Sequence, residues 1–206
     1  MVKPIEQMKR KRGTRQENRV ILIGTEGKNK TERLYFRGLN QKINGYVIRF
    51  ASGNDTDPLK IVKSTVNSSR KSKEGLNFKK GDLAFSVFDT DTDASKQRLI
   101  NAAIKYGKEH NVEVILSNPC FEVWYLQHFK YTTKQFKTSN DVVNMLHTYI
   151  PSYDKNADVF NSLWPNTRKA IDHCNDLQEY HMKFKKVRGV DRNPSSEMMN
   201  LIKYVL

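Results

Sequence analysis

The sequence predicts an α/β protein, in which a parallel sheet is flanked by helices and is followed by a helical C-terminal region. Short apolar runs alternate with helical patterns up to Lys130, which is typical of a parallel sheet. Beyond that residue the remaining candidates are helical. The 206 residues are enough for one hydrophobic core. We therefore expect a basic flexible arm over 1–18, an α/β core over 19–130 and a helical region over 131–206 packed on that core.

Each strand is predicted from a short apolar run, and each helix from apolar residues at helical spacing. The expected strands cover 19–24, 46–50, 82–88 and 112–116. The expected helices of the core cover 31–39, 58–70 and 94–110, and those of the C-terminal region cover 139–149, 167–180 and 195–206. Pro58 suits the first position of its helix. A further helix is expected to start with Asn118 as N-cap and Pro119 in first position.

The charge of the chain favours a polyanionic partner. Lysine and arginine total 36 against 22 acidic residues, which gives a net charge of +14. Nucleic acid is the commonest partner of such a protein, although a merely basic, soluble surface has the same composition. The predicted arm contains a basic cluster, which we expect to contact the phosphate backbone: Lys9, Arg10, Lys11 and Arg12.

The cysteine content and hydropathy indicate a cytoplasmic protein without a membrane partner. Cys120 and Cys174 form no metal-binding motif and are too few for a disulfide scaffold, so a reducing compartment is expected. The basic N-terminus is not followed by an apolar run, and no stretch reaches the ~20 apolar residues that a spanning helix needs.

Acidic residues follow two of the predicted strands. Glu26 comes after the first strand, and Asp89 and Asp91 come after the third. Ligands of open parallel sheets bind at the carboxyl ends of the strands, so these side chains are expected to meet. An Asp-x-Asp pair on an extended segment points both carboxylates to one face. Oxygen ligands without His or Cys suit Mg²⁺ or Mn²⁺, while the alternative is a polar turn in which Asp93 caps the next helix.

These strand ends resemble a known pattern. The segment 21–27, which ends in Glu26-Gly27, followed by Asp89-Thr90-Asp91, resembles the Toprim fold of topoisomerases, primases and nucleases. Three further motifs are similar to the RloB-like family, which includes AbiLii-type abortive-infection proteins. They are 30–36 (KTERLYF), 118–129 (NPCFEVWYLQHF) and 193–196 (NPSS).

The resemblance implies a Mg²⁺-dependent nuclease that acts as the toxic effector of an anti-phage abortive-infection system. It also implies an ABC/SMC-like ATPase as partner and RNA, such as tRNA, ahead of DNA as substrate. Glu26 is then a metal ligand and acid or base, and Asp89 and Asp91 hold the metal. Glu122 and Asn118 complete the site. The remaining candidates are Asp93 and Glu32 as outer metal ligands, and Lys28, Lys30 and His128 as substrate contacts.

Several alternatives stay open at this stage. Glu32 falls six residues after Glu26, where related nucleases have four, so a surface glutamate in a first helical turn is equally expected. Glu122 can be a partly exposed residue of a first turn, and His128 a packed histidine. The rival function is a non-catalytic, basic module that binds nucleic acid or a partner on a Toprim scaffold.

Overall fold

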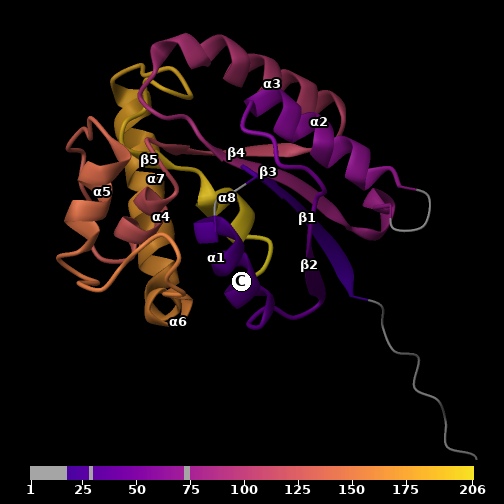
Figure 1. Ribbon diagram of the computed structural model, residues 1–206, viewed down its shortest axis with the longest axis horizontal. Coiled ribbons are helices and arrows are strands. Elements are labelled where there is room, and N and C mark those ends of the chain that lie inside the picture. Colours follow the sequence, from indigo (N-terminus) through magenta and orange to yellow (C-terminus); the bar gives the residue numbers. More distant parts are fainter. Residues whose placement is uncertain (1–17, 28–29, 72–74) are drawn as a thin grey trace, which may run out of the picture.

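The protein is an α/β structure built on one five-stranded sheet (Figure 1). The computed structural model describes residues 18–27, 30–71 and 75–206. The strand order is β2-β1-β3-β4-β5, with β1–β4 parallel and β5 antiparallel to β4. The strands are β1 Arg19–Thr25, β2 Tyr46–Phe50, β3 Leu83–Asp89, β4 Glu113–Asn118 and β5 Ser195–Ser196. The predicted fold class is confirmed.

The helices lie close to their predicted positions in the core. They are α1 Lys30–Asn40, α2 Pro58–Ser69, α3 Gln97–Glu109, α4 Glu122–Gln127, α5 Ser139–Leu146, α6 Phe160–Leu163, α7 Thr167–Lys183 and α8 Met198–Ile202. Pro58 opens α2 as predicted, and the Asp57 side chain accepts from Lys60 N at 2.9 Å, which caps the helix. Short 3₁₀ turns cover Phe78–Lys80, Ala94–Lys96 and Trp164–Asn166.

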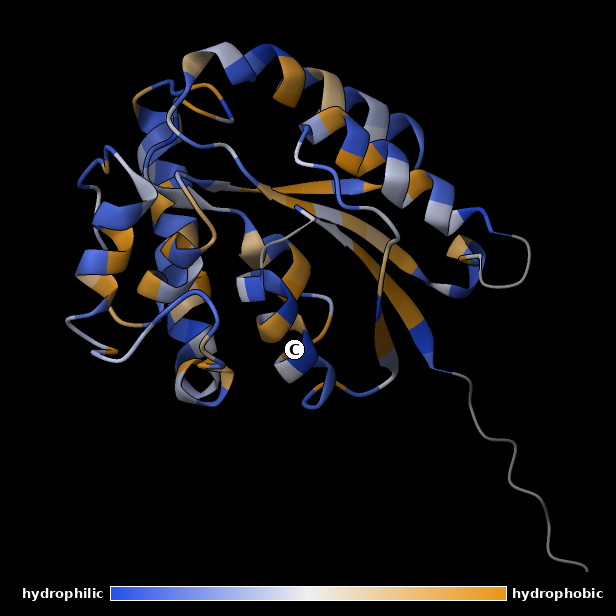
Figure 2. Ribbon diagram, viewed as in Figure 1, coloured by the Kyte–Doolittle hydropathy of each residue, from blue (hydrophilic) through white to orange (hydrophobic). Residues whose placement is uncertain are grey.

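The sheet is buried on both faces because its strand residues alternate between two apolar layers. Ile21 and Ile23 of β1 pack into the larger core cluster, whereas Leu22 packs into the second one. Helices α2 and α3 cover the face that carries Leu22, and α1 and α8 lie on the other (Figure 1). The strands are accordingly the most hydrophobic part of the ribbon in Figure 2.

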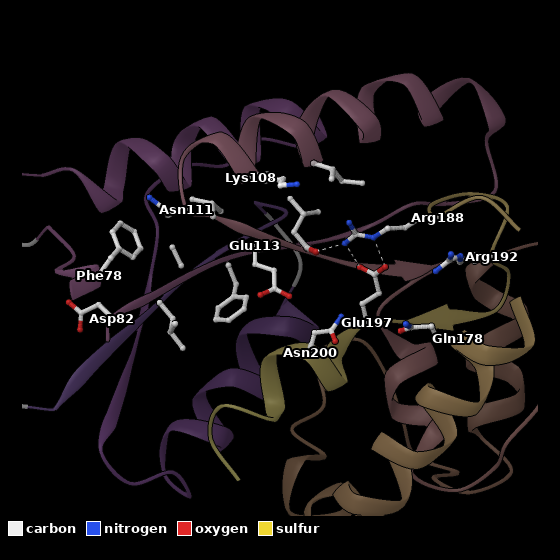
Figure 3. A pocket seen from close by; sticks show the side chains of 16 residues that line it. Phe78, Asp82, Lys108, Asn111, Glu113, Gln178, Arg188, Arg192, Glu197 and Asn200 are labelled. Atoms are coloured by element: carbon white, nitrogen blue, oxygen red, sulfur yellow. Dashed lines mark hydrogen bonds and ion pairs between the residues drawn. The ribbon is translucent and has the colours of Figure 1, made fainter. Parts of the chain in front are cut away.

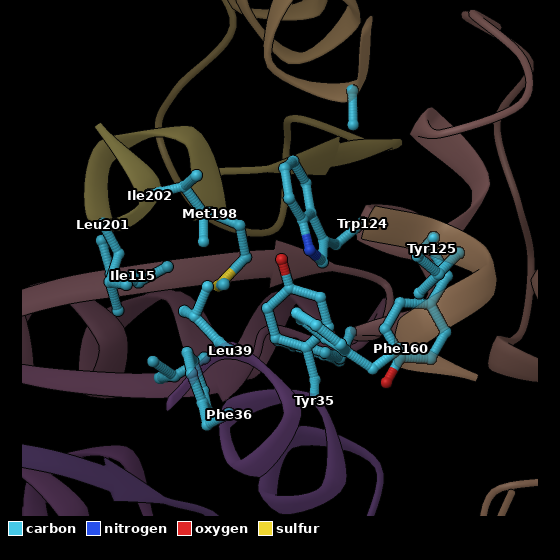
Figure 4. Close-up of a cluster of buried hydrophobic side chains, with 14 of the residues drawn as sticks. Tyr35, Phe36, Leu39, Ile115, Trp124, Tyr125, Phe160, Met198, Leu201 and Ile202 are labelled. Carbon is cyan, nitrogen blue, oxygen red and sulfur yellow. The ribbon is translucent and has the colours of Figure 1, made fainter. Parts of the chain in front are cut away.

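The larger core cluster joins the α/β core to the C-terminal region (Figure 4). Tyr35 of α1 lies with its ring centroid 6.2 Å from that of Trp124 and 5.3 Å from that of Phe160. Met198 and Ile202 of α8 belong to the same cluster. Trp124 and Tyr125 of the 118–129 motif are therefore fully buried.

The helix predicted over 195–206 is wrong at its start. Ser195 and Ser196 form β5 and pair with Asn118 and Ser117, and the helix α8 begins only at Met198. The sequence Pro-Ser-Ser is typical of a helix start, but here the serines extend the sheet instead. The short helix α6 was also not predicted, since four residues carry too little periodicity to be recognised.

The predicted N-cap role of Asn118 is also wrong. Asn118 is the last residue of β4, its peptide bond to Pro119 is cis, and α4 begins at Glu122. Its side-chain Nδ2 donates to the carbonyl oxygens of Gly189 and Val190, at 3.0 and 2.9 Å. The amide is therefore engaged by a distant loop and not by the helix that follows.

Within the residues that the structure describes, no helix is long and apolar enough to cross a membrane.

Candidate active site

The candidate site lies at the carboxyl edge of the sheet, between β1 and β3. The chain leaves β1 toward β2 on one side of the sheet and continues through β3 and β4 on the other. The strand order therefore reverses here, and loops that follow such neighbouring strands separate and leave room for a ligand. Thr25 pairs with Val87, so Glu26 follows β1 close to Asp89, the last residue of β3.

Glu26 is positioned by a tight approach of its neighbour Gly27 to the segment after β2. Gly27 N donates to Asp55 O at 3.1 Å. A Cβ atom on Gly27 would lie 2.2 Å from Asn54 Cα and 2.4 Å from its carbonyl carbon, which no side chain can occupy. The glycine after the glutamate is thus required by backbone packing, which explains the Glu-Gly pair at this strand end.

The Asp-x-Asp pair is not the extended segment that the sequence predicted. Asp91 has φ 51°, in the left-handed region, and only Asp89 belongs to β3. Thr90 between them is buried, and its N–H donates to Ser117 O at 2.9 Å. Asp91 forms an ion pair with Lys96 at the start of α3. The charge of Asp91 nevertheless acts on both other strand-end acids, since it raises the pKa of Asp89 and of Glu26.

Glu32 and Glu122 bring two further carboxylates to the same place. Glu32 lies in the first turn of α1 and is 1% exposed, so it is not a surface residue. Glu122 is 2% exposed, and its Oε1 accepts from Tyr153 Oη at 3.0 Å, with Thr31 Oγ1 at 3.5 Å. Buried glutamates need such partners. The charges of both residues raise the pKa of Asp89, as carboxylates in the same region do.

The electrostatics of this acid cluster centre on Asp89. Its pKa is raised well above 3.8, first by burial and then by the charges of Glu32, Glu122, Glu26 and Asp91. The residue is partly exposed, but its Oδ1 is buried and has no hydrogen-bond partner among the described residues. The pKa of Glu26 is also raised, by burial and by Asp91. Five acids thus share a small region, and a buried carboxylate oxygen there is available to a ligand.

Two lysines oppose these acids. Lys96 and Lys155 each lower the pKa of Glu26. The pKa of Lys96 is raised, because Asp91 accepts a hydrogen bond from it and stabilises its charged form. Lys155 is tied to α1 through its carbonyl oxygen, which accepts from Thr31 Oγ1 at 3.2 Å. Within the described residues, the five carboxylates, with these two lysines beside them, form a donor set that suits a bound cation.

The donor set suits a hard divalent ion such as Mg²⁺ or Mn²⁺, which binds carboxylate oxygen. In the described part of the chain, no three His, Cys, Asp or Glu side chains stand in an arrangement that could hold a metal ion. The acids therefore share one region, but no three of these side chains converge on a single ion position. Asp89, Glu26 and Asp91 are partly exposed and so accessible to an ion, whereas Glu32 and Glu122 are buried.

Some predicted site residues lie elsewhere. Asp93 is exposed, and its Oδ1 accepts from Ser95 N at 2.9 Å, so it caps the turn that precedes α3. His128 is 1% exposed, its Nδ1 lies 2.9 Å from Trp124 O, and burial lowers its pKa to about 4. A neutral histidine in the core cannot contact a substrate, and we leave it out of the site. Asn118 acts through its bonds to 189–190.

The basic substrate contacts are only partly described. Lys30 is the first residue of α1 and is exposed. Lys28 and the arm residues Lys9, Arg10, Lys11 and Arg12 lie outside the described residues, and their roles stay predictions.

Sequence reasoning missed three residues that shape the site. Tyr153 lies in the C-terminal region without a local signal of a role in the site, yet its hydroxyl donates to Glu122. Lys96 was not considered, although its position three residues after Asp93, at the start of a helix beyond the acidic turn, is a usable signal. In the sequence Lys155 fits either a phosphate contact or a solvated surface lysine. Its approach to Glu26 depends on the long path of the C-terminal region and has no local signal.

The fold and the acid cluster define the class of the protein: an open α/β sheet with an acidic site at the point where its strand order reverses. The family model of RloB-like proteins matches residues 21–205, and the chain belongs to this family. No curated protein and no solved structure matches the chain.

Proposed function

We propose that the protein is a Mg²⁺-dependent nuclease that hydrolyses phosphodiester bonds at the acid cluster. The observation that carries the proposal is Asp89, which has a buried carboxylate oxygen without a hydrogen-bond partner among the described residues and a pKa raised by burial and by four other acids. Such a concentration of like charge destabilises the fold, and it persists where a cation offsets it. A bound Mg²⁺ supplies an activated water and stabilises charge on the phosphoryl group.

The protein's own residues have three roles in this proposal: holding the ion, positioning the acids and supplying positive charge. Asp89, Glu26 and Asp91 supply the carboxylate oxygens that face the ion. Glu122, held by Tyr153, and Glu32, held in α1, fix the cluster from behind. Lys96 and Lys155 provide positive charge at the rim, where a phosphate would otherwise be repelled by the acids.

We further propose RNA ahead of DNA as the substrate, and a role as toxic effector in anti-phage defence with an ABC/SMC-like ATPase partner. Membership of the RloB-like family and the net charge of +14 support these points. The rival is a non-catalytic basic module on the same scaffold.

The test uses purified protein, labelled RNA and DNA, and matched acid-to-amide variants. Asp89→Asn and Glu26→Gln should lose cleavage by at least about a hundredfold. Asp93→Asn is the control, because asparagine caps a helix as well as aspartate does and residue 93 lies outside the cluster. It should cleave like the wild type. Equal activity in all three variants would refute the site.

Thermal unfolding separates the two candidate functions. An ion that binds only the native state raises stability by about 2.7 kcal/mol at a hundredfold excess over its Kd. Mg²⁺ should stabilise the wild type and Asp93→Asn, but not Asp89→Asn. Stabilisation without cleavage of either nucleic acid, alone or with the proposed ATPase partner, would favour a metal-binding but non-catalytic protein. The absence of both stabilisation and cleavage would favour the non-catalytic module.

A further inference from the structure

The end of α7 exposes apolar side chains among lysines. Over Met182–Val187, which we name the α7 tip, Met182 is 51% exposed and Phe184 and Val187 are each 57% exposed. Lys183 and Lys185 stand between them and are exposed as well. Single exposed apolar residues are ordinary, but three within six residues form a patch that suits a partner.

The α7 tip is held in one conformation by its own hydrogen bonds. Phe184 N donates to Tyr180 O at 3.2 Å, and the Phe184 and Tyr180 rings lie 4.9 Å apart. The Asp191 carboxylate accepts hydrogen bonds from Lys186 Nζ at 3.2 Å and from Val187 N at 2.9 Å. The aromatic ring is therefore supported on one side while more than half of the residue faces solvent. A supported ring loses little conformational entropy when a flat group stacks on it.

The segment after the tip is anchored to the sheet. Arg188 donates through Nε and Nη2 to the two carboxylate oxygens of Glu197 and through Nη2 to Val114 O of β4, each at 2.7 Å (Figure 3). Arg188 also lines a pocket of about 650 Å³ along β4. The anchor makes the tip a fixed projection from the sheet edge.

The same segment reaches the edge that carries the acid cluster. Gly189 O and Val190 O accept from Asn118 Nδ2, and the neighbouring residue, Ser117, pairs with Asp89. Gln97 Nε2, beside Lys96 at the start of α3, donates to Arg188 O at 2.9 Å. A chain that lies across the α7 tip can thus continue toward the acids.

We propose that the α7 tip is a platform for single-stranded nucleic acid, with a base stacked on Phe184 and phosphates on Lys183 and Lys185. This inference rests on the proposed function for its substrate class. Residues 180–192 contain five basic residues against one acid, Asp191, which complements a polyanion. Bases are flat and apolar on their faces, so a single strand matches both the ring and the lysines. In a duplex these faces are stacked on neighbouring bases and cannot stack on the Phe184 ring.

Binding is tested by fluorescence anisotropy with labelled single strands of about 20 nucleotides, oligouridine and oligothymidine, in EDTA. Phe184→Ala should bind about tenfold more weakly, and Phe184→Trp should bind as the wild type does. Phe78→Ala is the matched control, since Phe78 is also exposed and is followed by two lysines. It should bind as the wild type does. Unchanged affinity of Phe184→Ala, or an equal loss in Phe78→Ala, would overturn the platform.

The lysines are tested by salt dependence. Each phosphate contact on a single strand contributes about 0.7 to the slope of log K against log salt, so Lys183→Gln/Lys185→Gln should lower it by about 1.4. The control is Lys60→Gln/Lys105→Gln, which removes the same charge from exposed positions on α2 and α3. An equal loss in both pairs would show general attraction only and would overturn the assignment.

The two proposals fail in different ways, because binding in EDTA is independent of cleavage. If Asp89→Asn loses cleavage while all tip variants bind normally, the platform is wrong and the nuclease stands. If the tip variants lose single-strand binding and no variant or wild type cleaves, the platform stands and the nuclease is wrong. If a duplex of the same length binds as tightly as the single strand and loses as much affinity in Phe184→Ala, the platform is overturned. If an acidic protein binds in a manner that depends on Phe184, and nucleic acid binds without it, the platform is also overturned.

Discussion

Replacing Tyr153 by phenylalanine removes the hydroxyl that donates to Glu122 Oε1 at 3.0 Å. Glu122 is 2% exposed, so water cannot replace the lost donor. The other donor, Thr31 Oγ1, lies at 3.5 Å and also serves Lys155 O. A hydrogen bond to a charged group contributes about 1.5–3 kcal/mol, and we expect Tyr153→Phe to cost about 2 kcal/mol of unfolding free energy.

The assay is thermal and urea unfolding of Tyr153→Phe beside Tyr149→Phe. Tyr149 is 38% exposed and stacks on Phe129 with ring centroids 5.1 Å apart, so its replacement should cost little. For a chain of this length, about 2 kcal/mol corresponds to a fall in Tm of about 4–8 °C. In a Glu122→Gln background the bond is neutral, and the cost should fall to about 1 kcal/mol.

Equal stability of the two phenylalanine variants would refute this reasoning, as would a cost of Tyr153→Phe that is the same in the wild-type and Glu122→Gln backgrounds. The first result would mean that Glu122 has other partners, and the second that its charge does not matter. Because Tyr153 fixes Glu122 beside Asp89, the variant should also weaken stabilisation by Mg²⁺, whereas Tyr149→Phe should not.

Two further predictions concern the acid cluster. The pKa of Asp89 is raised above 3.8, so the folded protein holds this proton more tightly than the unfolded chain does. The contribution of Asp89 to the free energy of unfolding should therefore be greatest below pH 3.8 and be lost as the pH rises through the folded pKa. In EDTA, urea unfolding should show Asp89→Asn to be more stable than the wild type at pH 8 and to lose this advantage only as the pH falls toward the unfolded value of 3.8; an advantage independent of pH would contradict the electrostatic origin. Gly27→Ala places a Cβ 2.2 Å from the Asn54 backbone and should displace the adjoining glutamate, abolishing stabilisation by Mg²⁺. Gly38→Ala meets the Phe160 ring at 2.3 Å and should cost about 1–3 kcal/mol while keeping that stabilisation, and a Mg²⁺ response that is equal in both glycine variants would argue against the placement.

The sequence by itself determined the α/β core and the main acids of the candidate site. Apolar runs of strand length and helical spacing are local signals, so β1, β2 and α2 were found at or near their true bounds. Parallel strands end at a common edge, and this rule alone placed Glu26 with Asp89. The net charge and the motifs of the chain also needed no structure.

Tertiary structure decided everything that depends on partners distant in the chain. Ser195 and Ser196 form a strand because β4 has a free edge there, although locally they resemble a helix start. Asn118 was assigned as a cap from its neighbour Pro119, but its amide bonds to residues more than 70 positions away. Tyr153 reaches Glu122 across 31 residues, through a region whose packing no local pattern specifies. Local propensity gives the elements, whereas long-range hydrogen bonds and packing decide which side chains the folded chain brings to the site.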